Sequence, residues 1–586
     1  MANDNLAVIN LVLGIITQKK DISKVKYWPQ KPAFPLDSKE EQPFPRATPE
    51  SQGISSAYLI EAINALTDNE DTNIQKLMIL RHDKVIYEGG FAPWKLGIWH
   101  IEYSMCKSIT GMAIGLLIDE GKLTLETKLK DIFTQRKYLS LVSPALNLSV
   151  KDLLTMSTGI TLNEAGSIAS SSWLKNYLSA STNAPAGKVF NYNSMNSYVL
   201  SAIVTQITGL SLTDYLKPRL FEPLGIKDYF WEESPEKITK GGWGLFMKEE
   251  DAAKLGTLYL HRGKWHGKQI IPEPWVLASI STQIETKDIN KGYGYQIWRL
   301  DRKGAFTFTG MLGQNVLVYP DTDMVIVTNG GNKDLIQAGS MMKVLKKYFG
   351  AGFKPEAQDL NDPKAYKQLQ QLKHKLETGT TQEATRFMWL FTKDQTNKDH
   401  QKKIDRLNGL AYELDDQSVG LFPIVMQVFH NNYSEGIKSL SFRVEGTKLF
   451  IDFLEGKQVY PLEIGFNKEA INTIDMHGEP YLVSIKGTFA HDEDDREVLK
   501  LRIAYLEEAC TRLIKIFFNS DDKTIELRFN ERPGNRMIVE GLSSVKADKG
   551  TSKLIMDFVT NQGAMGALQK LISDSVAPVV RGYKKS

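Results

Sequence analysis

The chain has 586 residues, of which 42% are hydrophobic and 24% charged, so its composition is that of an ordinary soluble globular protein and excludes collagen-like, disordered and disulfide-scaffold chains. Its 72 basic and 69 acidic residues leave a net charge of +3, which is too even for a protein whose main task is to hold phosphate backbones or anionic membranes. Cys106 and Cys510 lie too far apart in sequence for a stapled framework, and no Cys/His ligand spacing is visible.

Residues 1–45 are predicted to form an N-terminal arm. The apolar run 6–17 is shorter than the roughly 20 residues that span a bilayer. The residues before it include Asp4 and no base, whereas a secretory signal begins with basic residues. We therefore favour an amphipathic arm over a signal peptide and expect a cytoplasmic location. The prolines between residues 20 and 50 favour an extended segment.

The next segment is predicted to mix helices with strands. A helix is expected over 55–66, and two apolar runs within 76–91 flank a polar turn, which favours a hairpin. Apolar residues recur with the helical period over 104–120, and Gly121 follows as a cap. Further along, the pattern is mostly helical over 125–257, returns to strands over 294–329 and ends in a helix over 334–349.

The composition changes near residues 350–363, and a charged helix is expected over 364–378. From about residue 407 the chain becomes a series of short alternating strands separated by turn signals, which is typical of a β-barrel or sandwich. The segment 551–586 is predicted to be a helical and basic tail, with its helix near 565–573.

Ser104-Met105-Cys106-Lys107 is an S-x-x-K tetrad at the start of the helix expected over 104–120. Residues three apart share a helix face, so the serine hydroxyl and the lysine amine would be neighbours. A serine needs a nearby base to become a nucleophile, and a lysine whose pKa burial lowers can serve. The spacing also occurs at other serines, but only Ser104 opens a strongly apolar helix after a hairpin.

Two further segments agree with this tetrad. Residues 190–194 read FNYNS and place Tyr192 after a Pro-Ala-Gly turn. Residues 308–314 read FTGMLGQ and lie on a predicted strand. Together with five longer strings, these segments make the chain resemble the serine β-lactamase and penicillin-binding-protein superfamily, in its class C-like, esterase-like branch. The strings are SMCKSITGMAIGLLIDEGKLTLETKL, VKDLLTMSTGI, PAGKVFNYNSMNSYVLSAIVTQITG, LKPRLFEPLGI and GGWGLFMKEEDAAKLGTLYL.

The resemblance implies a role for each matching residue. Ser104 would be the acylated nucleophile and Lys107 its proton partner. Tyr192 would help to move protons to the leaving group and to the deacylating water. Thr309 and Gly310 would bind substrate, and the amides of Met311 and Ser104 would form the oxyanion hole. Whether Lys107 or Tyr192 is the general base stays open.

Two positions depart from the family pattern. Ser194 occupies a place that is often asparagine, so it can still donate one hydrogen bond but over a shorter reach. Phe308 occupies a place that is usually lysine or histidine, so it adds no charge for a substrate carboxylate and favours an apolar substrate edge. Trp243, between glycines, is expected to line the substrate cleft or to be structural. These features favour ester, amide or peptide-like substrates over β-lactams.

The predicted fold class is α+β, with a β-lactamase-like catalytic domain followed by a β-rich domain that resembles the lipocalin-like barrels of some superfamily members. The expected boundaries are an arm over 1–45, a hydrolase domain over 46–350, a linker with a helix over 351–406, a β-barrel-like domain over 407–550 and a tail over 551–586.

The predicted function is that of a serine hydrolase that cleaves an ester, amide or peptide-like bond through an acyl-enzyme on Ser104. A β-lactamase or D-amino-acid peptidase is one alternative. A ligand-binding or sensor protein on a scaffold that has lost turnover is another. We expect no metal and no other cofactor, a small-molecule or peptide-like substrate, no nucleic-acid partner and no integral membrane segment, and a homo-oligomer stays open.

Overall fold

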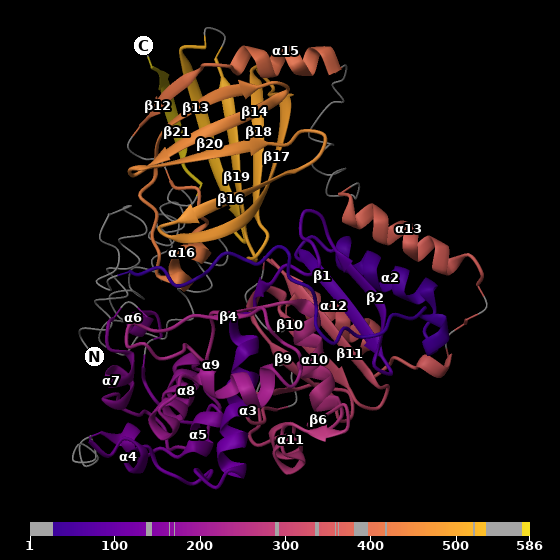
Figure 1. Cartoon of the computed structure of the whole chain (residues 1–586), viewed down its shortest axis with the longest axis vertical. Coiled ribbons are helices and arrows are strands. Elements are labelled where there is room, and N and C mark those ends of the chain that lie inside the picture. The colour runs from indigo at the N-terminus through magenta and orange to yellow at the C-terminus, as the bar shows by residue number, and fades with distance from the viewer. Residues whose placement is uncertain are drawn as a thin grey trace, which may run out of the picture. The chain divides into compact units, whose positions relative to one another are not determined.

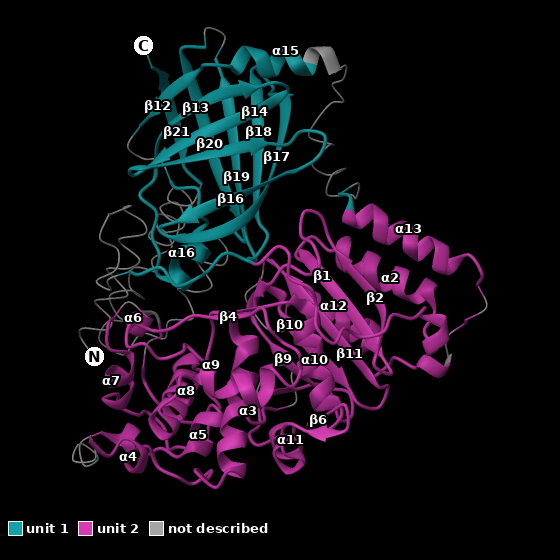
Figure 2. Ribbon diagram, in the orientation of Figure 1, with its two compact units in different colours: residues 1–34, 378–586 teal, residues 35–377 magenta. Residues whose placement is uncertain are grey.

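A computed structural model describes residues 27–135, 143–162, 164–168, 170–286, 292–333, 339–357, 359–360, 362–379, 397–415, 419–519, 522–534 and 577–585. The chain divides into two compact units, one of residues 35–377 and one of residues 1–34 with 378–586 (Figure 2). The predicted apolar arm over 6–17 and the predicted helix near 565–573 lie outside the described residues.

Unit 35–377 is built around a six-stranded antiparallel sheet in the order β2-β1-β11-β10-β9-β8 (Figure 1). The turn at His82 and Asp83 joins β1 to β2, as the sequence predicts, and both residues have the positive φ of a tight hairpin. The strands are β1 Ile74–Arg81, β2 Lys84–Gly90, β8 Trp298–Arg299, β9 Phe306–Thr309, β10 Asn315–Tyr319 and β11 Met324–Gly330.

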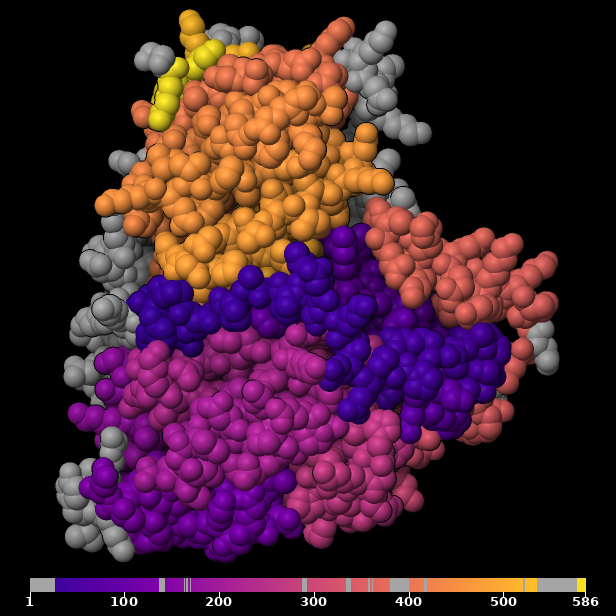
Figure 3. Space-filling view, in the orientation of Figure 1, coloured from indigo at the N-terminus to yellow at the C-terminus, as the bar shows by residue number. Residues whose placement is uncertain are grey.

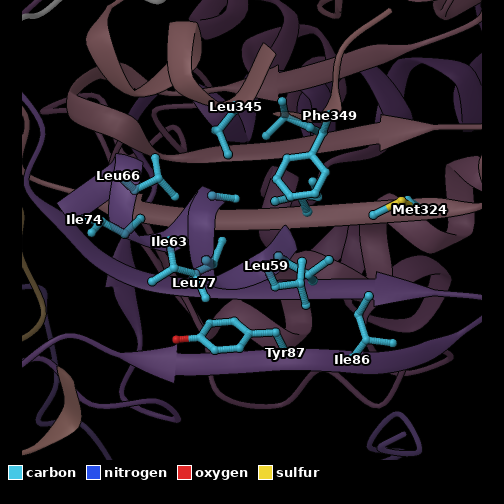
Figure 4. Packing of buried hydrophobic residues seen from close by; sticks show 14 of the residues in the cluster. Leu59, Ile63, Leu66, Ile74, Leu77, Ile86, Tyr87, Met324, Leu345 and Phe349 are labelled. Atoms are coloured by element: carbon cyan, nitrogen blue, oxygen red, sulfur yellow. The ribbon is translucent and has the colours of Figure 1, made fainter. Parts of the chain in front are cut away.

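Alternate side chains along these strands face opposite layers of helices. On one face, Leu59 and Ile63 of α2 and Phe349 of α12 pack on strand residues such as Leu77 and Tyr87 (Figure 4). On the other face, Gly256 of α10 lets that helix approach the sheet, because an added Cβ would lie 2.6 Å from Val316. The helices of these layers are α2 Ser56–Thr67, α10 Glu249–Leu260, α12 Ser340–Phe349 and α13 Ala365–Glu377.

A helical lobe makes up the rest of this unit. Its centre is α3, whose residues from Cys106 to Leu117 are all buried, as the apolar sequence predicts. The lobe helices are α3 Cys106–Asp119, α4 Leu129–Ile132, α5 Val150–Leu154, α6 Glu164–Ile168, α7 Trp173–Leu178, α8 Ser194–Thr208, α9 Leu212–Leu216 and α11 Glu273–Ser279. The small strands are β3 His100–Ile101, β4 Phe230–Trp231, β5 Leu245–Met247, β6 Lys264–Trp265 and β7 Lys268–Gln269.

The second unit is a ten-stranded antiparallel sheet that curls into a nearly closed barrel, in the order β15-β14-β13-β12-β21-β20-β19-β18-β17-β16 (Figure 1). The strands are β12 Ala411–Leu414, β13 Ile437–Glu445, β14 Lys448–Glu455, β15 Gln458–Ile464, β16 Ala470–Met476, β17 Glu479–His491, β18 Glu497–Tyr505, β19 Thr511–Phe518, β20 Thr524–Arg532 and β21 Val579–Lys584. Helices α15 Asn397–Leu407 and α16 Ile424–His430 accompany them. On the face seen in Figure 3, outward side chains cover these strands as one continuous surface.

Side chains bridge the barrel where its two edge strands meet. The Asn472 amide on β16 accepts from the Glu463 backbone N–H on β15 at 2.9 Å and donates to the Glu463 carbonyl oxygen at 3.0 Å. An asparagine side chain thus supplies hydrogen bonds that a strand backbone would otherwise make, and it links β15 to β16 where a regular tenth strand pairing would close the barrel.

The ends of the chain correct the sequence prediction at one point. Residues 551–586 were expected to form a helical, basic tail, yet Val579–Lys584 form β21, between β12 and β20. The expected strands from residue 407 and the α+β class are confirmed. Among the described residues no single helix is long and apolar enough to cross a membrane, while Ser194–Thr208 with Leu212–Phe221 meets the length and composition criteria only as a pair bent by 71°.

Candidate active site

The turn that carries Ser104 is strained. Ser104 lies in the 3-10 turn Tyr103–Met105, directly before α3. Tyr103 has a φ of 43°, in the left-handed region that costs a non-glycine residue about 1–3 kcal/mol and that clusters at functional sites. The helix that follows places Lys107 one turn later, and its Nζ lies 2.8 Å from Ser104 Oγ. The predicted serine–lysine neighbourhood is therefore present.

The Lys107 amine is held by a second partner. Its side chain is 2% exposed, and Nζ donates to the Gly242 carbonyl oxygen at 2.6 Å. This carbonyl is an uncharged acceptor that helps to fix the position of the amine beside Ser104. Nζ thus contacts the Gly242 carbonyl and the Ser104 hydroxyl together, and the second contact is within the distance that proton exchange between a serine and a lysine requires.

The glycines of residues 241–244 allow this approach. An added Cβ at Gly241 would lie 2.8 Å from the Ser197 carbonyl oxygen, and one at Gly242 would lie 2.8 Å from the Ser194 carbonyl oxygen. Only residues without side chains can bring the backbone this close to α8. The contact of Gly242 with Lys107 is a part of the candidate site that the sequence analysis does not single out, although the paired glycines were the available signal.

Trp243 does not line an open cleft in this structure. Its side chain is 4% exposed, and its ring stacks on Trp173 with centroids 5.3 Å apart. Its carbonyl oxygen accepts a hydrogen bond from the Trp231 indole at 3.0 Å. The expectation of an aromatic wall at Trp243 is therefore replaced by its alternative, a structural role in packing the glycine-rich turn.

Tyr192 lies beside the lysine although it is far from it in sequence. The Tyr192 ring centroid is 5.1 Å from Lys107 Nζ. The Tyr192 ring also stacks with the Trp298 ring, with centroids 5.9 Å apart and 24° between the ring planes. Phe190 and Tyr293 belong to the same aromatic cluster as Tyr192 and Trp298. Packing within this cluster therefore holds the Tyr192 ring in place.

Ser194 begins α8 and faces a carboxyl group. Its backbone N–H donates to the Glu164 carboxylate, a short hydrogen bond between the first residue of α8 and the first residue of α6. Burial raises the pKa of Glu164, and the nearby Lys107 amine partly opposes this rise. Glu164 is thus an acidic neighbour of the site that carries no motif and that the sequence did not single out.

The end of β9 lies against the serine turn. A methyl group on Gly310 would clash with the Glu102 carbonyl oxygen, so only glycine lets the two segments meet here. Gly310 N–H donates to the Gln314 carbonyl oxygen at 2.6 Å, and Leu312 has a φ of 62°, so the turn is tight and strained. Within the described residues, neither the Ser104 nor the Met311 backbone N–H donates to an acceptor. Both remain available for an oxyanion.

The structure does not bring Phe308 to this site. Its side chain is fully buried and packs edge-on against Tyr259 of α10, with ring centroids 5.3 Å apart. Because side chains alternate along β9, Thr309 points the other way, and its hydroxyl bonds to Thr307 at 3.0 Å. The expectation that Phe308 forms an apolar substrate edge is therefore wrong. Phe308 indeed supplies no charge, but the face of the sheet to which its side chain points is set by the alternation of side chains along β9.

Replacing Gly310 by alanine should separate the two amide donors. The added methyl group must push β9 away from the Glu102 carbonyl, and misplacing one oxyanion donor typically costs about 10²–10³ in rate. We expect the rate at which a fluorophosphonate acylates Ser104 to fall by about that factor while the protein stays folded. Gly352→Ala is the matched control, because an added Cβ there meets nothing within 4 Å. An unchanged rate in Gly310→Ala would argue against an oxyanion hole at this turn.

No group of three or more His, Cys, Asp and Glu residues in the described segments lies close enough to hold a metal ion. A serine–lysine pair with an adjacent tyrosine, set between an antiparallel sheet and a helical lobe, is instead typical of hydrolases with the β-lactamase fold. Residues 61–334 match the family model described as Beta-lactamase, so this part of the chain is a domain of that family. The family resemblance predicted from the sequence is confirmed.

Individual relatives were found among curated proteins and solved structures. The 6-aminohexanoate-dimer hydrolase of Paenarthrobacter ureafaciens is 25% identical over 291 residues, which cover 44% of this chain and 72% of the relative. A penicillin-binding protein homolog from Caulobacter crescentus has a TM-score of 0.43 and 15% identity, covering 54% of this chain and 100% of its own. A family VIII carboxylesterase has a TM-score of 0.43 and 14% identity, covering 52% and 99%.

Proposed function

We propose that this protein hydrolyses an amide or ester bond through an acyl-enzyme on Ser104. The observation that carries the proposal is the 2.8 Å distance between Lys107 Nζ and Ser104 Oγ, in a family domain whose relative is named as a dimer hydrolase. The Gly242 carbonyl supports it further, because it orients the amine toward the hydroxyl.

The proposed reaction has two halves. Ser104 Oγ attacks the substrate carbonyl carbon and passes its proton to the Lys107–Tyr192 pair, while the Ser104 and Met311 amides stabilise the tetrahedral oxyanion. The carbon–nitrogen or carbon–oxygen bond then breaks, and the leaving group takes that proton. Water then attacks the resulting ester and gives its proton to the same pair. As the bond between the acyl carbon and Ser104 Oγ breaks, the pair returns that proton to Oγ, so the acid is released and the Ser104 hydroxyl is restored.

We propose open-chain amides and esters as the substrate class. At position 308 the chain has a buried phenylalanine where the superfamily usually has a cation, so a substrate carboxylate finds no charge from that residue. The relative named for a 6-aminohexanoate dimer supports an open-chain amide as one member of this class.

Mass spectrometry after a fluorophosphonate tests the acyl-enzyme, and we expect one adduct on Ser104 in the folded protein. A panel of p-nitrophenyl acetate, the linear 6-aminohexanoate dimer, a chromogenic cephalosporin and a D-alanyl dipeptide tests the substrate class. We expect turnover of the first two to exceed that of the last two. Absence of any adduct and of any turnover would favour the ligand-binding alternative, whereas rapid cephalosporin hydrolysis would favour a β-lactamase.

A further inference from the structure

Glu102 lies two residues before Ser104 and takes no part in the proposed chemistry. Its side chain is 1% exposed, and its Oε1 accepts a hydrogen bond from Asn329 Nδ2 on β11 at 3.0 Å. Its backbone carbonyl is the group that Gly310 approaches, and the same carbonyl accepts from Met105 N–H at 3.1 Å. A buried carboxyl group is costly, so its place directly behind the serine turn needs a physical reason.

The hydrogen bonds continue from Asn329 to the oxyanion turn. Asn329 Nδ2 is also 3.3 Å from Gln314 Oε1, and both side chains are fully buried. Gln314 Nε2 donates to the Met311 carbonyl oxygen at 3.1 Å and to the Gly330 carbonyl oxygen at 2.9 Å. Three side chains from three separate parts of the chain thus connect the residues around Ser104 to Met311.

Charged groups surround Glu102 on several sides. Lys76 of β1 forms a buried ion pair with Glu249 of α10 at 3.1 Å, and both act on Glu102, the lysine favouring its ionised form and the glutamate opposing it. His100 of β3 bonds to the Gln75 side chain at 2.7 Å, and the Cys106 thiol is a further buried neighbour. Burial dominates and raises the pKa of Glu102 to about 8, so the carboxyl is mostly protonated at neutral pH.

We propose that Glu102, Asn329 and Gln314 form a positioning relay that holds the Ser104 and Met311 backbone amides at the spacing an oxyanion needs. The inference rests on the proposed function and adds to it three positioning residues to which the family resemblance gives no role. The relay acts through hydrogen bonds. The backbone at Tyr103 and Leu312 is strained, so the two turns would relax to other conformations if these hydrogen bonds did not hold them. Ionisation of Glu102 would place a negative charge behind the developing oxyanion and oppose it.

Two substitutions test the relay by the rate at which a fluorophosphonate labels Ser104 between about pH 6 and pH 10. Asn329→Ala breaks the relay at its centre, and we expect a drop of about 10²-fold at pH 7, as for a misplaced oxyanion donor. Glu102→Gln keeps an acceptor for Asn329 but cannot ionise, so we expect a rate close to wild type at pH 7 and the loss of the decline that the wild type shows above about pH 8. Asn315→Ala is the matched control, because that buried amide is next to Gln314 and bonds to Thr328 instead.

Stability against urea gives a second readout that does not depend on turnover. In the unfolded chain the pKa of Glu102 is near its ordinary value of 4.5, while in the folded protein burial raises the pKa to about 8. The folded state therefore binds more protons in this window, and its free energy of unfolding falls as the pH rises through it. Glu102→Gln should flatten this slope.

Each result bears on a separate claim. If the wild type is labelled and folded Asn329→Ala is labelled at the same rate, the relay is overturned and the acyl-enzyme proposal stands. The same follows if the labelling rate of Glu102→Gln still declines at alkaline pH. If the wild type is not labelled at all, the proposed function fails and the relay's role fails with it. A purely structural role would shift the unfolding midpoint of these variants without changing the pH profile of labelling.

Discussion

Ser104→Ala is expected to abolish the fluorophosphonate adduct and to lower ester and amide turnover by about 10⁴-fold or more, because the acyl-enzyme can no longer form. The substitution removes only the hydroxyl, and its partner Lys107 keeps the hydrogen bond to the Gly242 carbonyl oxygen. Turnover of p-nitrophenyl acetate and of the linear 6-aminohexanoate dimer measures the effect, with a denatured-protein blank for spontaneous hydrolysis.

Ser108→Ala is the control for this substitution. Ser108 is a buried serine on the next turn of α3, and its hydroxyl donates to the Gln296 carbonyl oxygen at 2.8 Å, away from Lys107. We expect a modest loss of stability and full labelling of Ser104 in this variant. Turnover that survives in Ser104→Ala at the wild-type level would place the chemistry elsewhere and would end the acyl-enzyme proposal.

Lys107→Met is expected to lower the acylation rate by about 10²–10⁴-fold, the usual contribution of a general base. Methionine has a similar length and fills the same buried space, but it cannot accept the serine proton. Lys107→Arg should be about as slow, because a guanidinium stays protonated and so offers a charge without a base. Stopped-flow measurement of p-nitrophenol release separates acylation from deacylation in both variants.

The comparison of the two variants tells proton transfer from electrostatics. Recovery of most activity in Lys107→Arg would show that position 107 supplies charge rather than basicity, and Tyr192 would then be the stronger candidate for the base. Lys346→Met is the control, because Lys346 is a partly buried lysine on α12 whose pKa burial lowers, and it has no part in the proposed proton transfer. It should acylate like the wild type.

Local pattern predicted much of the fold. The apolar period after Ser104 indicated α3, the turn at His82 and Asp83 indicated the β1–β2 hairpin, and alternating residues after 407 indicated the barrel strands. These elements could be predicted because their signals lie within a few residues. Strand β21 could not, because Val579–Lys584 gains its partners from β12 and β20, which are far away in sequence.

The site divides in the same way. Ser104 and Lys107 lie one helical turn apart, so the tetrad alone indicates that they meet, and the quoted motifs added Tyr192 and Met311 through the family resemblance. The sequence does not indicate that Gly242 accepts a hydrogen bond from Lys107, because the acceptor is a backbone carbonyl oxygen, which every residue carries. Phe308 was assigned to the wrong side because a motif does not tell which face of a strand is covered by a helix.

By itself, the sequence determined the kinds of elements, the helix face that pairs a serine with a lysine, and the family to which residues 61–334 belong. Only the tertiary structure decided which backbone carbonyl holds the amine, which tryptophan and phenylalanine are buried, and which buried amides connect Glu102 to Met311. The reason is physical: periodicity and turn chemistry act between near neighbours, whereas burial and hydrogen-bond partners depend on segments that meet only after the chain has folded.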